Sequence, residues 1–196
     1  MAIPHRTKVL RIFAIIFMNL TKEYLAEQED TIRRNYDVHI SWGNNPHIRD
    51  RYMFLKDFCK GANTILDVGC GGVEAWAIGA THACDVHPVA EELLKKNGWD
   101  GKFFIASCDD LKVPSQSFDV AVCSEVIEHL PNLEIIKKTF QELSRVARRW
   151  IVSTPAVDVK EPTHRFIFTL EDLKKLTEGL DVQIIKRDIF YYVIKN

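Results

Sequence analysis

The sequence has no C-x-x-C pair, no apolar run of membrane-spanning length and almost no net charge. Its 26 basic and 27 acidic residues leave a formal net charge of −1, which excludes the strong global field of a general nucleic-acid binder. The 196 residues are 46% apolar and 27% charged, as expected for one globular domain with a sizeable core. Because the cysteines are odd in number and lack zinc-site spacing, we predict buried thiols in a reducing cytosol. They are Cys59, Cys70, Cys84, Cys108 and Cys123.

The N-terminus carries an apolar run, Ile12 to Leu20, after a basic start. The run is too short to span a bilayer, and no A-x-A cleavage site follows it. It is either a helix that docks on the domain or on a membrane surface, or a segment upstream of a natural start at Met18. The second interpretation is favoured, and residues 1–17 receive no function. We expect a cytoplasmic protein without stable membrane insertion.

Residues 1–60 are predicted to be an N-terminal helical segment and lid. Residues 20–35 are polar and helix-prone, Gly43 and Pro46 predict a loop over 36–50, and Gly61 ends a helix over 50–60. The aromatic and histidine side chains of this segment either cover a pocket or pack against the domain, with even weight on the two interpretations. They are Tyr36, His39, Trp42, His47 and Tyr52.

Residues 61–196 form the second predicted unit, in which short apolar bursts alternate with helical stretches. This pattern predicts an α/β fold: a Rossmann-like, doubly wound, mostly parallel seven-stranded sheet in three α/β/α layers. The last two bursts are so close that they predict an antiparallel edge hairpin. The bursts are Thr64–Val68, Thr81–Val86, Phe103–Ala106, Asp119–Cys123, Trp150–Ser153, Val182–Ile185 and Phe190–Ile194.

Two helices of this unit are clear from the sequence. Ile136, Phe140, Leu143 and Ala147 form one apolar stripe at helical spacing. A later helix begins at Thr169, with an acid three residues on that completes a capping box.

A glycine-rich turn directly follows the first strand, in the sequence Asp67-Val68-Gly69-Cys70-Gly71-Gly72. Such a turn at the carboxyl end of a strand is where doubly wound folds bind nucleotides, although tight strand–helix turns also use glycine for structural reasons. The second strand ends in Asp85, whose carboxylate can accept hydrogen bonds from both hydroxyls of a ribose. The alternative is that Asp85 caps the following helix. The short interval between the two acids requires a short or irregular helix between the strands.

The turn favours a cationic cofactor over a dinucleotide. The dinucleotide fingerprint needs a third glycine where this chain has Glu74, and a carboxylate there would repel a pyrophosphate. S-adenosylmethionine has no phosphate and carries a positive sulfonium. A nicotinamide-dependent oxidoreductase therefore stays as the less favoured alternative.

Three motifs then resemble one known family. ILDVGCGG is similar to the first motif of class I S-adenosylmethionine-dependent methyltransferases, PSQSFDVAVCSEVIEHLPN to their fourth-strand motif and WIVSTP to their fifth strand. The resemblance covers roughly residues 62–196. The sequence departs from the family pattern at Val73, where a third glycine is usual, and at Ser107, where an acid is usual and Asp109 follows two residues later.

The resemblance implies S-adenosylmethionine as cofactor and assigns a role to each matching position. The backbone of Gly69, Cys70 and Gly71 would face the methionine part, and Asp67 would hold its amino group directly or through water. Asp85 and the adjacent Val86 would bind the ribose. The segment after the third strand would edge the adenine, and the end of the fourth strand would face the sulfonium. These last positions are Ser107, Cys108 and Asp109, and Ser124 and Glu125.

The stretch EVIEH contains the candidate catalytic residues Glu125 and His129. The first interpretation is a shared scaffold, and the second makes His129 a general base. The third is a metal site formed with Glu128 and His164, because EVIEH followed by a later histidine is similar to the small-RNA 3′-terminal 2′-O-methyltransferases related to Hen1. That interpretation ranks last, and no metal ligand is assigned.

We therefore predict an S-adenosylmethionine-dependent methyltransferase with a small molecule as the favoured acceptor and RNA as the alternative. A non-catalytic module that keeps the fold stays open. The loop from Ala156 to Phe168 is expected to form an acceptor wall. The sequence gives no oligomeric state.

Overall fold

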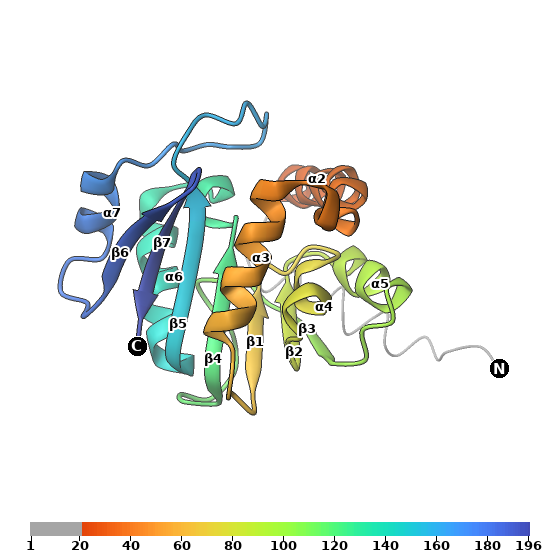
Figure 1. The fold of residues 1–196 in the computed structure, drawn as a ribbon, viewed down its shortest axis with the longest axis horizontal. Helices are drawn as coiled ribbons and strands as arrows, with labels where there is room; N and C mark the ends of the chain where they lie inside the picture. The colour runs from red at the N-terminus through yellow and green to blue at the C-terminus, as the bar shows by residue number, and fades with distance from the viewer. Residues whose placement is uncertain (1–20) are drawn as a thin grey trace.

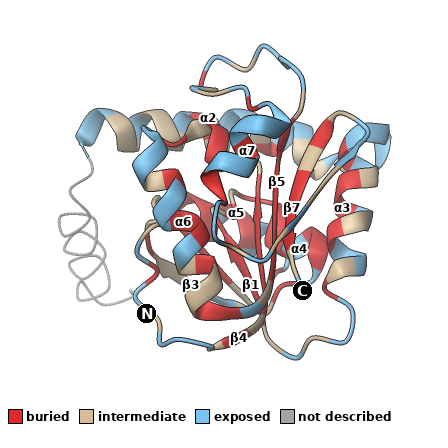
Figure 2. Cartoon of the chain, turned by 90° about the vertical axis from the view of Figure 1, so that its left-hand side faces the viewer, coloured by how far each residue is buried: buried red, intermediate tan, exposed pale blue. Residues whose placement is uncertain are grey.

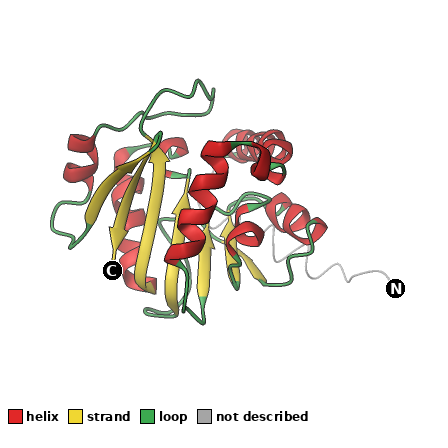
Figure 3. Cartoon of the chain, viewed as in Figure 1, coloured by secondary structure: helices red, strands yellow, loops and turns green. Residues whose placement is uncertain are grey.

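The computed structural model describes residues 21–196, so the predictions for the apolar run and for a start at Met18 lie outside it. A seven-stranded sheet forms the centre of the molecule (Figures 1 and 3). Its strands are β1 (Ile65–Val68), β2 (His82–Asp85), β3 (Lys102–Ile105), β4 (Phe118–Ser124), β5 (Ala147–Pro155), β6 (Gln183–Arg187) and β7 (Phe190–Lys195).

The strand order is β3-β2-β1-β4-β5-β7-β6. The five strands from β1 to β5 pair in parallel, whereas β7 pairs antiparallel with both β5 and β6. This arrangement confirms the predicted mostly parallel sheet and its antiparallel edge hairpin. From β1 the chain builds the sheet outward through β2 and β3, and then returns to place β4 on the other side of β1. The carboxyl ends of β1 and β4 are therefore the switch point, where ligands bind in open α/β sheets.

Helices cover both faces of the sheet and give the predicted three layers (Figure 1). One face packs against α3 (Pro46–Phe58), α4 (Glu74–Ile78) and α5 (Val89–Lys96), and the other packs against α6 (Leu133–Val146) and α7 (Leu170–Leu176). In α6 the predicted stripe residues Ile136, Phe140 and Leu143 are fully buried, as the burial view in Figure 2 shows for the core as a whole.

Local sequence signals account for how several helices begin and end. Thr169 caps α7 through the predicted capping box. The helix between β1 and β2, α4, has only five residues and ends at Gly79 with φ +74°, so the short interval does produce a short helix. All five cysteines are buried and unpaired, as predicted. None of the helices among residues 21–196 is long and apolar enough to cross a membrane.

The predicted loop over residues 36–50 is wrong. Helix α2 (Lys22–Ile40) continues to Ile40, a 3₁₀ turn η1 (Trp42–Asn44) follows, and α3 already begins at Pro46. Pro46 occupies the first turn of α3, where its missing N–H costs nothing, and the Asn45 side chain accepts hydrogen bonds from the N–H groups of residues 47 and 48. Proline here starts a helix, and Gly43 fits within the turn.

Candidate functional site

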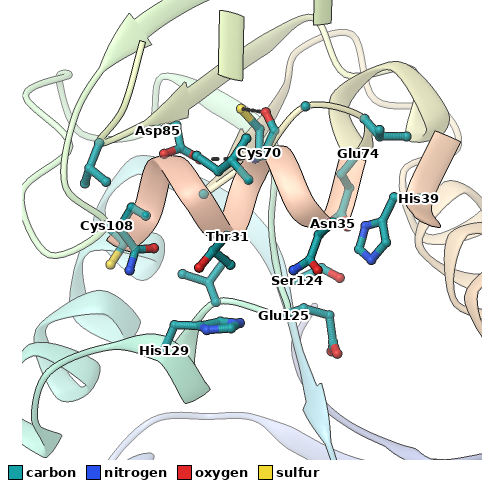
Figure 4. Close-up of a pocket in the computed structure, with 18 of the residues that line it drawn as sticks. Thr31, Asn35, His39, Cys70, Glu74, Asp85, Cys108, Ser124, Glu125 and His129 are labelled. Atoms are coloured by element: carbon teal, nitrogen blue, oxygen red, sulfur yellow. Dashed lines mark hydrogen bonds between the residues drawn. The ribbon is translucent and has the colours of Figure 1, made fainter. Parts of the chain in front are cut away.

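A pocket of about 250 Å³ opens at the carboxyl ends of β1, β2 and β4, beneath helix α2 (Figure 4). Its floor is the glycine bend that follows β1, and α2 lies across it as a roof. The pocket therefore lies at the switch point of the sheet. Of the predicted cofactor-binding residues, Gly69, Cys70, Gly71, Asp85, Val86, Cys108, Ser124 and Glu125 line it.

The glycine bend has a backbone that side chains would disturb. Gly69 and Gly71 have φ angles of +70° and +52°, in the left-handed region that favours glycine. The Gly69 N–H donates to the Cys84 carbonyl at 2.9 Å, which ties the bend to β2. A Cβ added at Gly69 would lie 2.5 Å from Cγ2 of Val126. Glycine is therefore required here by both conformation and close approach.

Asp85 faces this bend from the end of β2. One carboxylate oxygen accepts the Gly71 N–H at 3.1 Å, and the other accepts the His87 N–H at 3.1 Å. The first N–H of α5, from Val89, donates to Nδ1 of His87 and not to Asp85, so the alternative role of Asp85 as the cap of that helix does not hold. Burial raises the pKa of Asp85 to about 6, although the backbone hydrogen bonds oppose that rise. Asp85 and the glycine bend thus lie side by side, as the sequence predicts.

Asp67 lies behind the bend rather than in the pocket wall. It is 1% exposed, and neither carboxylate oxygen has a hydrogen-bond partner. Burial raises its pKa well above the ordinary value, and the neighbouring carboxylates of Glu74 and Asp85 raise it further. Burying an acid this deeply costs free energy unless a cation or a hydrogen-bond donor contacts it.

Arg51, which the sequence analysis missed, supplies a positive charge to the same region. It projects from α3, is 2% exposed and lies 3.2 Å from a Glu125 carboxylate oxygen and 3.8 Å from one of Glu74. Its Nε and Nη2 atoms are buried without hydrogen-bond partners. Among residues 21–196, it is the one arginine or lysine that lines the pocket.

Glu125, at the end of β4, is held in a strained conformation. Its φ is +56°, which costs free energy for a residue with a side chain and is typical of functional sites. The Ser153 hydroxyl donates to one carboxylate oxygen at 3.0 Å, and Arg51 pairs with the other. Glu125 is therefore fixed at the pocket wall by two partners.

The predicted adenine edge is only partly present in the wall. Ser107 and Cys108 line the pocket, but Asp109 does not, and its carboxylate accepts a hydrogen bond from the Ser107 hydroxyl instead. The Cys108 thiol accepts a hydrogen bond from Thr139 at 3.2 Å, and burial raises its pKa to about 12, so it is a neutral thiol.

The EVIEH stretch and the loop after β5 bring three metal-ligand side chains together. Glu128, His129 and His164 each offer one ligand atom, and these atoms all lie within 4.8 Å of one another. The Nδ1 atom of His129 lies 3.0 Å from the Thr163 hydroxyl and 3.2 Å from the Thr163 carbonyl oxygen. Burial lowers the pKa of His129 to about 4, so its imidazole is neutral. Neutral imidazoles and a carboxylate are a donor set that divalent metals accept.

Helix α2 covers the pocket and is tied to the rest of the molecule. Arg34 donates to the Glu161 carboxylate at 2.6 Å, and Arg165 pairs with Glu27. The Tyr36 hydroxyl donates to the side chain of residue 97 at 2.7 Å. The pocket-lining residues of α2 recur at helical spacing, so a single face of the helix forms the roof. They are Tyr24, Gln28, Thr31, Ile32, Asn35, Tyr36 and His39.

Comparison with known proteins connects this geometry to a family. Residues 66–149 match the family model described as a methyltransferase domain. The chain carries a methyltransferase domain. The matched stretch contains the glycine bend, Asp85 and the EVIEH residues. The comparison confirms the methyltransferase resemblance inferred from the motifs.

Two related proteins, one similar in sequence and one in fold, are methyltransferases. A ribosomal protein L11 methyltransferase of Thermotoga petrophila is 30% identical over 158 residues, which cover 74% of this chain and 57% of that relative. The chain thus spans little more than half the length of this relative. The N-methyltransferase NodS of Bradyrhizobium japonicum, in complex with S-adenosyl-L-homocysteine, has a TM-score of 0.65 at 15% identity, covering 85% of this chain and 96% of NodS.

A second similar structure is the methyltransferase domain of a bacterial Hen1. It has a TM-score of 0.57 at 21% identity and covers 74% of this chain and 96% of that domain. At these identities the two structural likenesses establish the fold and leave residue roles to the geometry of the site. They confirm the Rossmann-like α/β fold class.

Proposed function

We propose that this protein is an S-adenosylmethionine-dependent methyltransferase that transfers a methyl group to a small molecule. The observation that carries the proposal is the pairing of the Asp85 carboxylate with the glycine bend at the switch point of the sheet. The cofactor would supply an electrophilic methyl group on its sulfonium. The protein would bind it, align the acceptor and exclude water.

The residues of the pocket fit such a cofactor. At one end, Asp85 would accept the ribose hydroxyls, with Val86 and Cys108 beside the adenosine. At the other end, the unpartnered Nε and Nη2 donors of Arg51 suit a carboxylate, and the unpartnered oxygens of Asp67, behind the bend, would hold an ammonium group through water. Figure 4 shows Asp85 and Cys108 toward one end of the pocket and Glu74 toward the other. Buried polar atoms without partners are rare in folded proteins, so a ligand that completes them is the simplest account.

The acceptor site would lie between the roof and the EVIEH stretch. Because α2 lies across the pocket as a roof, the geometry favours a small molecule or a single projecting group over an extended acceptor surface. His129 is the candidate base and Glu125 faces the sulfonium in this proposal. Residues 21–60 would serve as the lid, since the ion pairs of α2 hold it across the pocket. The five unpaired buried thiols support a reducing, cytoplasmic location.

A thermal-shift and calorimetric comparison of S-adenosylhomocysteine with NAD tests the proposal. We expect the protein to bind S-adenosylhomocysteine. Binding should be weaker in Asp85→Asn and unchanged in the exposed control Asp110→Asn. Stabilisation by NAD alone would show that the fold serves an oxidoreductase. Binding of S-adenosylhomocysteine without methyl transfer from labelled cofactor to any pool of small molecules, protein or RNA would instead indicate a non-catalytic module.

The cluster of Glu128, His129 and His164 favours one second candidate, a metal-dependent RNA 3′-terminal 2′-O-methyltransferase. A divalent ion there would lower the pKa of a ribose hydroxyl and orient it. The test is labelling of RNA 3′ ends with and without Mn²⁺. This candidate requires metal-dependent labelling that His164→Ala removes and that the exposed control His47→Ala keeps. Labelling of small molecules alone, insensitive to chelator, would rule it out.

A further inference from the structure

Two buried acids, Glu74 and Asp67, have carboxylate oxygens that no hydrogen bond within the protein satisfies. Glu74 is 6% exposed and lines the pocket, and its Oε1 atom has no hydrogen-bond partner. Asp67, directly behind, has two unpartnered oxygens. Only Glu74 of the pair reaches the wall, and the sequence motifs give it no role in binding.

The charges around Glu74 leave this end of the pocket with more acids than cations. Burial, with a smaller contribution from the Glu125 carboxylate, raises the pKa of Glu74 to about 7, although Arg51 and a hydrogen bond from Ser124 oppose the rise. The single guanidinium of Arg51 is shared between Glu74 and Glu125. The titratable and charged groups around Glu74 and Asp67 come from α3, the bend, β2 and β4. They are Arg51, Tyr52 and Cys59, then Cys70, Cys84, Asp85, Cys123 and Glu125.

We propose that Glu74 is a specificity-determining residue that pairs with the ammonium group of the amino-acid end of the ligand and releases a proton to solvent when that ligand binds. The inference rests on the proposed function, because it takes the ligand to be an adenosyl amino acid. In the empty pocket the Glu74–Asp67 pair keeps at least one carboxyl protonated, since two buried like charges repel. An incoming ammonium replaces that proton as the counter-charge.

The chemistry of the site selects an amino acid over other ligands. Arg51 has free donors for a carboxylate, while Glu74 in the same wall has a free acceptor for an ammonium, so both charges of a zwitterion are matched within one corner. A phosphate ligand would meet the same acid and be repelled. A neutral adenosine lacks both groups and leaves the buried atoms unpaired.

Calorimetry in buffers of different ionisation enthalpy tests the proposal, with S-adenosylhomocysteine as the probe. At pH 6.5 we expect release of roughly one proton per ligand by the unaltered protein, and an affinity that rises between pH 5.5 and 7.5. Glu74→Gln should lower the affinity by about 10- to 100-fold, as expected for a lost charge-assisted hydrogen bond, and should abolish most of the proton release. The exposed control Glu92→Gln should leave both unchanged.

A second variant separates pairing from folding. Glu74→Asp keeps the carboxyl group on a shorter side chain, so proton release should persist with weaker binding. 5′-Methylthioadenosine, which lacks the amino-acid end, should bind without proton release to all variants. If Glu74→Gln releases as many protons as the unaltered protein, the inference is wrong, whatever the affinity. If the unaltered protein binds neither adenosyl ligand, the proposed function itself fails.

Discussion

Replacing Gly69 by alanine is the sharpest test of how the pocket floor is built. The new Cβ would lie 2.5 Å from Cγ2 and 3.1 Å from Cγ1 of Val126, distances that real Cβ atoms avoid. The residue would also hold a φ of +70°, where a side chain is strained. Two separate costs, steric and conformational, therefore act on the same substitution.

The geometry at Gly69 gives each of these two costs an expected magnitude. The left-handed conformation costs about 1–2 kcal/mol for a residue with a Cβ. The contact with Val126 is overpacking, which costs about 1–3 kcal/mol. Lower entropy of the unfolded chain returns about 0.4–1 kcal/mol. Gly69→Ala should thus reduce the free energy of unfolding by roughly 2–4 kcal/mol, a large part of the stability of a domain this size.

A double-mutant cycle separates the two costs. Val126→Ala removes the methyl groups that clash, so in its presence Gly69→Ala should cost only about 1 kcal/mol, with a coupling of about 1–3 kcal/mol. The matched control is Gly98→Ala, which has φ +81° and no atom near its Cβ and carries the conformational cost alone. Urea denaturation measures all four values. A Gly69→Ala variant no less stable than Gly98→Ala, or one that Val126→Ala does not rescue, would refute the steric argument.

Three further predictions follow from single groups. Asp85→Asn should weaken S-adenosylhomocysteine binding by about 10- to 100-fold in calorimetry, because a neutral amide cannot accept two hydroxyls as strongly; undiminished affinity would remove Asp85 from the ribose site. Thr169→Ala should cost about 1 kcal/mol of unfolding free energy and lower Tm by about 2–4 °C, because α7 loses its capping box; an unchanged Tm would mean that this end of α7 contributes nothing. A carboxyl with a raised pKa binds protons in the folded state, so its presence destabilises the protein as pH rises from its ordinary value of 4.5 toward 7. Glu74→Gln should therefore gain stability over the unaltered protein across that range, by at most about 3 kcal/mol, and a constant difference between urea curves at pH 5 and pH 7.5 would contradict the raised pKa.

The sheet could be predicted because burial on both faces leaves a simple sequence pattern. Every apolar burst became a strand within one or two residues, apart from β5, which begins three residues before Trp150, at Ala147, a residue expected on the helix stripe. Ala147 is fully buried in the strand, and the end of the helix stripe would bury it as well. Its place in the apolar pattern therefore could not distinguish the end of a helix from the start of a strand. The glycine bend and Asp85 were also predictable, because their roles depend on neighbouring strands that the pattern already located.

The N-terminal part of the site was harder to predict. Gly43 and Pro46 were taken as loop signals, although proline also starts helices, and Asn45 before it is a capping residue. With α3 extended back to Pro46, Arg51 falls between Ile48 and Leu55 on the buried stripe. A charged residue on an apolar helix stripe was the available signal. Its partners, far along the chain, could not be identified without the fold.

Arg51 also changes how the N-terminal segment should be divided from the rest. A lid that only covers a pocket could be removed with the pocket intact, yet removing α3 would take from Glu74 and Glu125 the cation that they share and would expose both acids. Removing the Arg51 charge within the intact fold would cost several kcal/mol, since Glu74 and Glu125 would then be buried without a cation. We therefore infer that the boundary near residue 60 separates sequence motifs and does not separate independently folding units. The segment before β1 completes the electrostatics of the pocket, so the folded unit extends at least from α3 to β7.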